Sequence, residues 1–237
     1  MGLSRTCMSD QIRQILQDRI VSGTLRPGDR LLELEIAREF NTSQTPVREA
    51  LEALHTQKLV ESIPYRGTYV RAISSREMEE AYAVRGVLEQ LAAELAALIL
   101  KGDVSELREI QRQLHAAAKV GDILAYAAHN EQFHRTIVER SENQVLLESW
   151  QNLGFETRVR VLMSKHAEPD LVARAAEHDP VIDALEQQDG AAAGRFLREH
   201  ATMCSQRWQA RMAATQDQID SGKPAEGGQH VPAGVLS

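Results

Sequence analysis

The chain has 237 residues, of which 43% are hydrophobic, 26% charged and 4% aromatic, with a net charge of -7; this composition excludes a disordered chain or a fibre and favours helices. No apolar run reaches the roughly 18 residues of a membrane span, the N-terminus lacks a signal-peptide pattern, and Cys7 and Cys204 form no disulfide framework, so we expect a cytoplasmic protein with no membrane partner. Residues 1–75 carry ten basic and nine acidic residues, so the acidic excess lies in the rest of the chain and the N-terminal part can still present a basic face.

The first forty residues alternate between helical and extended patterns. Apolar residues at helical spacing predict an amphipathic helix over 9–22. The residues of this stripe are Ile12, Ile15, Leu16 and Ile20. A Pro-Gly turn then leads into an expected short strand at 30–32, and a short helix is expected over 33–40.

A third helix and a hairpin complete this region. Pro46 fits the first turn of a helix whose apolar face contains Val47, Leu51 and Leu54. Two short extended pieces follow at 60–63 and 68–73, joined by a turn that contains proline and glycine. This order of elements predicts a winged helix-turn-helix DNA-binding domain over residues 1–75.

The start of the helix near Thr45 has the residue types that a DNA-reading helix needs. Small hydroxyl side chains and free backbone N–H groups at a helix start bind phosphate, while amide and guanidinium groups address base edges. Two residues at the tip of the hairpin are placed to follow the adjacent groove or backbone. The predicted contacts with double-stranded operator DNA are Arg38, Ser43, Gln44, Thr45, Arg48, Arg66 and Gly67.

From Ser74 onward the sequence shows helical periodicity and no further strand pattern. Glycine, asparagine and proline divide this part into about six expected helices. Their ranges are 75–100, 103–119, 122–140, 143–165, 168–188 and 190–213. We therefore expect a mainly α protein in which an all-helical domain over 76–214 follows the winged helix. The Gly/Pro-rich segment 215–237 is expected to be a disordered tail.

Histidines in three of these helices indicate a metal site. Asn130 and His134 are four residues apart and share one helix face, and His178 and His200 fall in two later helices. Imidazoles that meet inside a bundle would bind a divalent ion such as Zn, Ni or Mn. The alternative is that each histidine is a surface or core residue without a ligand. The remaining histidines have no such support: His55, His115, His129, His166 and His230.

Three segments of the N-terminal region resemble the GntR superfamily of regulators. SQTPVREAL at 43–51 is similar to the family's recognition helix, commonly SRTPVREAL, and LRPGDRLLELEIAREF and YRGTYV also fit. Gln44 replaces the usual arginine, which removes a charge and is expected to shift operator preference. The segments AYAVRGVLEQ, HNEQFHRTIVER and AAEHDPVIDALEQQDG resemble the FCD effector domain of the FadR-type subfamily.

The resemblance implies roles for residues of the helical domain. Asn130, His134, His178 and His200 would be the metal ligands, with Asn130 in a place often held by Asp, which should weaken the metal. Arg85 would project into the cavity and bind a carboxylate in a bidentate way, although a salt bridge between helices is also open. A metal and an arginine together imply a small organic acid as effector.

We expect a homodimeric repressor that an organic acid releases from its operator. One alternative is a winged-helix regulator whose bundle only dimerises. Another is a metal-dependent helical-bundle enzyme. A di-iron enzyme needs Glu-x-x-His on two helices, and Glu131 and His134 supply one such pair. Ala175 and Leu197 stand where the second glutamate would be, so we expect no enzyme.

Overall fold

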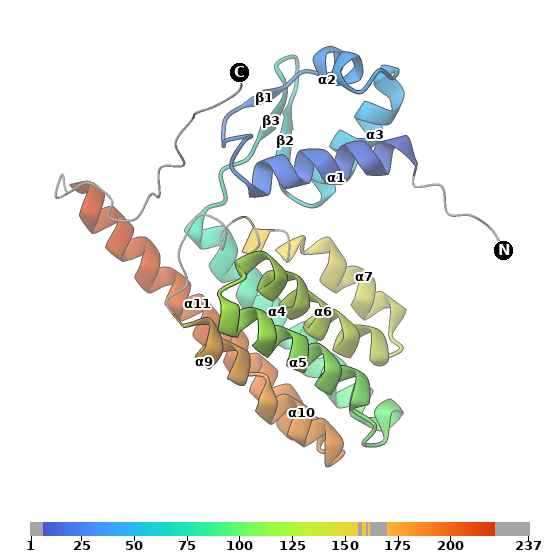
Figure 1. Ribbon diagram of the computed structural model, residues 1–237, viewed down its shortest axis with the longest axis vertical. Helices are drawn as coiled ribbons and strands as arrows, with labels where there is room; N and C mark the ends of the chain where they lie inside the picture. Colours follow the sequence, from blue (N-terminus) through green and yellow to red (C-terminus); the bar gives the residue numbers. More distant parts are fainter. Residues whose placement is uncertain (1–6, 156–157, 160, 162–169, 221–237) are drawn as a thin grey trace.

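The computed structural model in Figure 1 describes residues 7–155, 158, 159, 161 and 170–220, with side chains as far as 214. Its N-terminal unit has the element order of a winged helix. The elements are α1 (Met8–Val21), β1 (Arg30–Leu31), α2 (Glu33–Glu39), α3 (Gln44–Thr56), β2 (Val60–Ile63) and β3 (Gly67–Val70). The three strands form an antiparallel sheet in the order β1-β3-β2. The predicted winged helix-turn-helix is therefore confirmed.

A small apolar core holds α3 against α1. Ile12 and Leu16 of α1 and Val47 and Leu54 of α3 are at most 1% exposed. Ile15, which we expected in the same stripe, is 38% exposed because it lies at the margin of the buried face. Burial of the apolar face of α3 leaves the opposite face of this helix directed to solvent.

The C-terminal unit is all helical in its described part, as predicted. Its helices are α4 (Ser75–Leu100), α5 (Ser105–Val120), α6 (Ile123–Arg140), α7 (Gln144–Asn152), α9 (Leu171–Ala176), α10 (Asp179–Glu186) and α11 (Gly190–Asp220). In Figure 1 the winged helix lies at one end of this bundle, and α4 leads directly from β3 into it.

Three expected boundaries differ from the structure. The helix predicted over 143–165 is interrupted after Asn152, where Gly154 has a φ of +56°, and the described residues 155, 158, 159 and 161 are again helical. The helix predicted over 168–188 is divided into α9 and α10, because Pro180 starts a new helix in its first turn. α11 continues to Asp220 and so occupies the start of the expected tail; residues 221–237, which include His230, lie outside the described residues, as do His166 and Pro169.

Small residues allow α4 and α11 to cross closely. A Cβ atom added to Gly194 would lie 2.8 Å from the carbonyl oxygen of Gln90, and one added to Gly86 would lie 3.2 Å from the Cβ of Ala201. These contacts also show that the two helices run antiparallel. The close crossing brings the middle of α11 beside the middle of α4, where the site described below is found.

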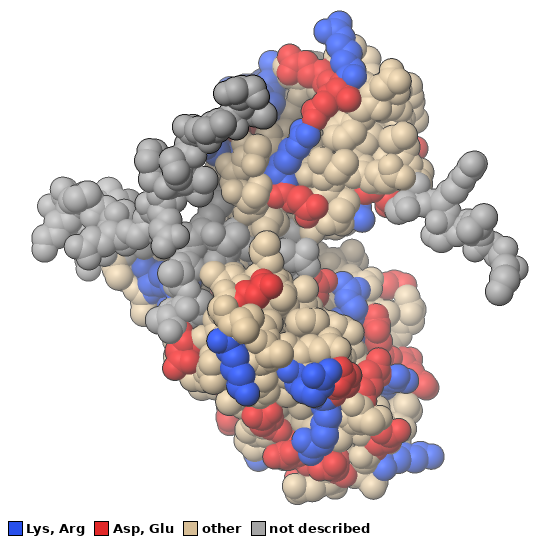
Figure 2. Space-filling view, viewed as in Figure 1, with Lys and Arg blue, Asp and Glu red and all other residues tan. Residues whose placement is uncertain are grey.

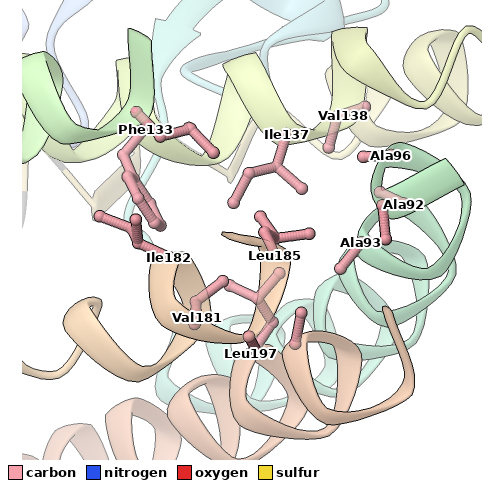
Figure 3. Close-up of a cluster of buried hydrophobic side chains, with 14 of the residues drawn as sticks. Ala92, Ala93, Ala96, Phe133, Ile137, Val138, Val181, Ile182, Leu185 and Leu197 are labelled. Carbon is pink, nitrogen blue, oxygen red and sulfur yellow. The ribbon is translucent and has the colours of Figure 1, made fainter. Parts of the chain in front are cut away.

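The main core of the bundle contains buried side chains of α4, α5, α6, α7, α10 and α11, and Figure 3 shows part of it. Alanines of α4 face larger apolar side chains of α6, α10 and α11, so that small and large residues interdigitate. The residues labelled there are Ala92, Ala93, Ala96, Phe133, Ile137, Val138, Val181, Ile182, Leu185 and Leu197. This core fixes the positions of the helices that carry the histidines.

Charge is distributed over both units. On the face shown in Figure 2, positive and negative side chains are interspersed over the helical domain, and the winged helix carries both signs. Within the described part of the chain, none of the helices combines the length and the apolar character that crossing a bilayer requires.

Candidate nucleic-acid interface and metal centre

The start of α3 is exposed, as a DNA-reading helix requires. Ser43 is the N-cap residue and Thr45 follows in the first turn, and both are exposed. Arg38, Ser43 and Gln44 line one surface hollow between α2 and α3. The structure thus brings three of the predicted DNA contacts together in one place.

Arg48 lies one helical turn further along this surface. Its Nε donates to Glu33 at 2.7 Å, and its guanidinium also donates to the side-chain oxygen of Gln44 at 3.1 Å. The Arg48 side chain is 63% exposed. An exposed ion pair of this kind contributes little stability, so Arg48 can exchange Glu33 for phosphate or base atoms at small cost. The sequence analysis did not identify Glu33 as this partner.

The predicted wing residues lie at the tip of the hairpin. Arg66 and Gly67 are both exposed, and Gly67 has a φ of +104°, which favours glycine. A Cβ atom at Gly67 would lie 3.2 Å from the Arg30 guanidinium. Arg30 therefore adds a second positive charge near the tip, which the sequence analysis missed because β1 is distant in sequence.

Three of the four predicted metal ligands meet inside the bundle. His134 lies on α6, His178 is the N-cap residue of α10, and His200 lies on α11. All three are at most 6% exposed, and their ligand atoms lie within 4.8 Å of one another. The Nε2 atoms of His134 and His178 are 3.3 Å apart. Asn130 is half-buried one turn before His134, and its role as a ligand stays a prediction.

Carboxylates contact the far nitrogens of two of these rings. Glu89 Oε2 lies 3.0 Å from His134 Nδ1, and Glu177 Oε2 lies 3.0 Å from His200 Nδ1. Carboxylates placed in this way orient imidazoles in metal sites and make them better donors. Neither glutamate was identified from the sequence, although the spacing of Glu89 from Arg85 was a usable signal.

Glu89 is held by three neighbours in a buried network. Arg85 Nε donates to Glu89 Oε1 at 2.6 Å, and the Trp150 indole donates to the same oxygen at 2.9 Å. Burial raises the pKa of Glu89, but the charges of Arg85 and His134 outweigh it and hold this pKa below its usual range. The carboxylate is therefore ionised.

The histidines differ in their electrostatics. Burial, with the charge of Arg85, lowers the pKa of His134 to about 4, and burial also holds the pKa of His178 well below its usual value. Both rings are thus neutral near pH 7, the form that binds a metal. For His200 burial acts in the same direction, but Cys204 and Glu177 outweigh it and raise its pKa.

Arg85 is inside the bundle, as the resemblance implied, but it is already partnered. It is 4% exposed, pairs with Glu89 and lies with its guanidinium carbon 4.4 Å from the centroid of the Phe155 ring. The alternative that we weighed was a salt bridge between helices, whereas the ion pair present lies within α4. A role in binding a carboxylate stays a prediction.

The cluster fits a divalent metal ion. With Zn–N bonds of about 2.0–2.1 Å, two nitrogens of a tetrahedral site are about 3.3–3.4 Å apart, which matches the 3.3 Å between His134 and His178. Buried imidazoles, two of them with a carboxylate at the far nitrogen, are the donor set expected for such an ion. The other described histidines lie elsewhere: His55 on α3, His115 on α5 and His129 near the start of α6.

Comparison with known sequences matches the chain to two protein families and to transcriptional repressors. Residues 8–70 match the description "Bacterial regulatory proteins, gntR family", and residues 80–203 match the FCD domain. A protein of Paenarthrobacter nicotinovorans named "Probable D-xylose utilization operon transcriptional repressor" is 36% identical over 198 residues, which are 84% of this chain and 87% of that protein. The gluconate operon transcriptional repressor of Bacillus subtilis is 28% identical and covers 80% of each chain.

Solved structures give the same result. E. coli McbR/YncC superposes with a TM-score of 0.73 at 25% identity, over 87% of this chain and 99% of that one. A GntR-type transcriptional regulator from Rhodococcus sp. RHA1 superposes with a TM-score of 0.67 at 26% identity, over 85% and 97%.

The fold and the exposed α3 surface, with these relatives, define a DNA-binding transcriptional regulator with a helical effector domain, and not an enzyme. More narrowly, the chain belongs to the GntR family of bacterial regulatory proteins and carries an FCD domain.

Proposed function

We propose that this protein is a cytoplasmic homodimeric repressor that binds operator DNA and leaves it when an organic acid binds the FCD domain beside a divalent metal ion. Residues 1–75 would bind DNA, and residues 76–214 would dimerise and sense the effector. The observation that carries the proposal is the exposed start of α3 with Arg48, in a family whose relatives here are named as repressors.

The DNA-binding part of the proposal rests on the shape and chemistry of α3. A recognition helix enters the major groove with its N-terminal residues against base edges. Gln44, Thr45 and Arg48 would occupy those positions, while Arg38 and Ser43 would contact phosphate. Arg66 and Gly67 would follow the neighbouring backbone or minor groove.

An apolar stripe on α4 supports the homodimer. Its members recur at helical spacing on the solvent side of the helix, away from the buried alanines. They are Val84 at 47% exposure, Val87 at 50%, Leu91 at 43% and Leu98 at 70%. A second copy of the chain would cover this stripe and would place two recognition helices in successive major grooves, about 34 Å apart.

The metal would be held by His134, His178 and His200, with Asn130 as the predicted fourth ligand. When bound, it would supply a Lewis-acid centre for carboxylate and hydroxyl oxygens. Arg85 would hold a carboxylate of the effector by two hydrogen bonds. Gluconate, the compound in the name of one relative, has both a carboxylate and hydroxyl groups, which is the chemistry this site would bind.

Contacts between the site and α3 support a route for the signal. Trp150 joins α7 to Glu89, and Arg85 packs on Phe155 just beyond α7. Gly154 lies against the backbone of Gln57 at the end of α3. Because Arg85 is buried and paired, an effector that binds it must displace neighbours, and these contacts would carry the movement to the recognition helix.

Arg48→Ala tests the DNA-binding part. We expect a loss of about 1–3 kcal/mol in operator affinity, about 5- to 150-fold in Kd, if Arg48 reads a base. The operator is first selected from random duplex DNA with the purified protein, and Kd values are then measured by gel shift. Arg76→Ala is the matched control, because Arg76 is exposed and lies on α4. Equal affinities for both variants would contradict the assignment.

A thermal-shift screen of small carboxylic acids, with and without chelator, tests the sensing part. We expect hydroxy acids to stabilise the metal-loaded protein and to weaken operator binding. Tighter operator binding in the presence of a stabilising acid would contradict release by effector.

Metal analysis of protein purified without nickel columns tests the metal. If metal-free protein still responds to the effector, the metal is not required for sensing. If operator binding does not respond to any of the acids, the helical domain serves only for dimerisation.

A further inference from the structure

We infer that Cys204 is a further ligand of the metal ion, and that it supplies a thiolate beside His200. This inference rests on the metal centre proposed above and goes beyond its ligand set of Asn130, His134, His178 and His200. It concerns a residue for which the sequence analysis predicted only the absence of a disulfide framework.

The position of the sulfur matches that of a ligand. Cys204 Sγ lies 3.6 Å from His200 Nε2. With a Zn–S bond of about 2.3 Å and a Zn–N bond of about 2.0–2.1 Å, sulfur and nitrogen in a tetrahedral site are about 3.5–3.6 Å apart. The separation is therefore the one that two donors to a single ion would have.

The secondary structure favours the same pair. His200 and Cys204 are four residues apart on α11, a spacing that places both side chains on one helix face. His200 belongs to two groups of ligand atoms, one with His134 and His178 and one with Glu177 and Cys204. His200 is the residue that the two groups share, so Cys204 would reach an ion bound by the histidines beside His200.

The surroundings of the sulfur suit an anionic ligand. Cys204 is 6% exposed, and guanidinium nitrogens of Arg174 and Arg207 lie 3.6 Å and 3.4 Å from Sγ. Glu177 fixes Arg207 through two hydrogen bonds, of 2.5 Å and 2.7 Å. A buried cysteine that only fills space has no need of two cationic donors, whereas metal-bound donors are commonly hydrogen-bonded by outer groups.

A thiolate would also restore the charge that Asn130 lacks. An amide oxygen at position 130 is a neutral donor, so none of the four predicted ligands, the three imidazoles and Asn130, brings a negative charge directly to the ion. When the Cys204 sulfur binds, the thiol loses one proton and brings one negative charge to the ion. Because thiolate is a soft ligand, it favours Zn over Mn.

Cobalt substitution tests this inference. Metal-free full-length protein is titrated with Co²⁺, whose visible bands report a bound ion and whose intense near-ultraviolet band reports a cobalt–thiolate bond. We expect both bands in the unchanged protein. Cys204→Ser should lose the near-ultraviolet band, keep visible bands and bind Zn at least about tenfold more weakly, since even outer-shell changes cost that much.

Cys7→Ser is the matched control, because the chain has two cysteines and Cys7 is exposed. It leaves Cys204 as the sole source of a thiolate band, so its spectrum decides the matter even if Cys204→Ser does not fold. Visible bands without the near-ultraviolet band in Cys7→Ser would overturn the role of Cys204 and leave the metal centre intact. No cobalt bands in any of the proteins would overturn the metal centre itself.

Discussion

Glu89 links the histidine cluster to the rest of the FCD domain. It contacts His134 on one side and receives hydrogen bonds from Arg85 and Trp150 on the other. A buried carboxylate with three polar partners keeps its charge where an isolated one would take up a proton. The orientation of the His134 ring thus depends on a residue that need not touch the ion.

Glu89→Gln should weaken metal binding about 10- to 100-fold, because the amide cannot supply the negative charge that makes His134 a strong donor. Competition with a zinc chelator measures the change. Glu80→Gln is the control, since Glu80 is exposed on the same helix and pairs only with Arg76 in the contacts described. Unchanged zinc affinity in Glu89→Gln would show that His134 is not a ligand.

For individual residues, the sequence predicted the three histidines of the cluster but not the side chains that contact them. Helical spacing and the family motif were sufficient to select His134, His178 and His200, which the structure brings together. Glu177 and Cys204 were missed because their contacts depend on the crossing of α9 and α10 with α11, and charged residues at helical spacing usually lie in solvent.

Among the elements, α7 and the turn after it contribute one contact between the two units. A polar cavity of about 360 Å³ lies between α1 and this region, lined in part by Arg13, Gln57, Arg135 and Gly154. Beside the cavity, the backbone of Gly154 touches that of Gln57. The sequence analysis placed a continuous helix here, because a single glycine within a periodic pattern is a weak signal for a break.

Gly154→Ala should alter communication between the units. The added Cβ would lie 2.6 Å from the Gln57 carbonyl oxygen, so the contact must open. We expect the effector-induced change in operator Kd to differ from that of the unchanged protein by about 2- to 30-fold, the range of 0.5–2 kcal/mol seen for coupling mutations. Gel shifts with and without effector measure it.

Gly121→Ala is the control for backbone strain. Gly121 also has a positive φ, +70°, but an added Cβ would meet no atom within 4 Å. A coupling change of the same size in both variants would assign the effect to strain and not to the contact with Gln57.

The start of α4 is a second junction between the units. Ser74 accepts a hydrogen bond from the backbone N–H of Glu77, and Glu77 reaches back to Ser74 in a capping box. Glu77 also pairs with Arg71 at the end of the wing. The sequence analysis placed the domain boundary here from the loss of strand patterning, but the cap is visible in the sequence only as Ser-x-x-Glu.

Ser74→Ala should destabilise the protein by about 0.5–2 kcal/mol, because the first turn of α4 loses its cap. Urea unfolding followed by circular dichroism measures this loss. Ser75→Ala serves as the comparison, since Ser75 lies inside the helix and does not cap it. Equal free energies of unfolding for the two variants would show that the capping box does not stabilise this junction.

For the whole molecule, the proposed homodimer is the property that a single chain does not display. The sequence predicted the fold class of both units, because helical periodicity and turn residues are local signals. It could not indicate which helix faces another copy, since the α4 stripe alternates with buried alanines and resembles any core helix.

Leu91→Glu should separate the dimer, because a charge would replace an apolar side chain within the stripe. Light scattering should show a monomer at concentrations where the unchanged protein is dimeric, and operator binding should fall with it. Val120→Glu tests for a general effect of the charge, since Val120 is 78% exposed on α5. A dimeric Leu91→Glu protein would exclude α4 as the interface.

The single helix α4 carries three of the features described above. Its first turn forms the capped junction with the wing, while the Arg85–Glu89 pair and the exposed apolar stripe lie on different faces of the helix. If two copies associate along this stripe, binding of any ligand that rotates or shifts α4 is thermodynamically linked to dimerisation. The linkage is reciprocal, so dimerisation also changes the affinity for the ligand. Cells holding few copies of the regulator would then respond at a different metabolite level from cells holding many. Sensitivity would be set by abundance as well as by the chemistry of the pocket.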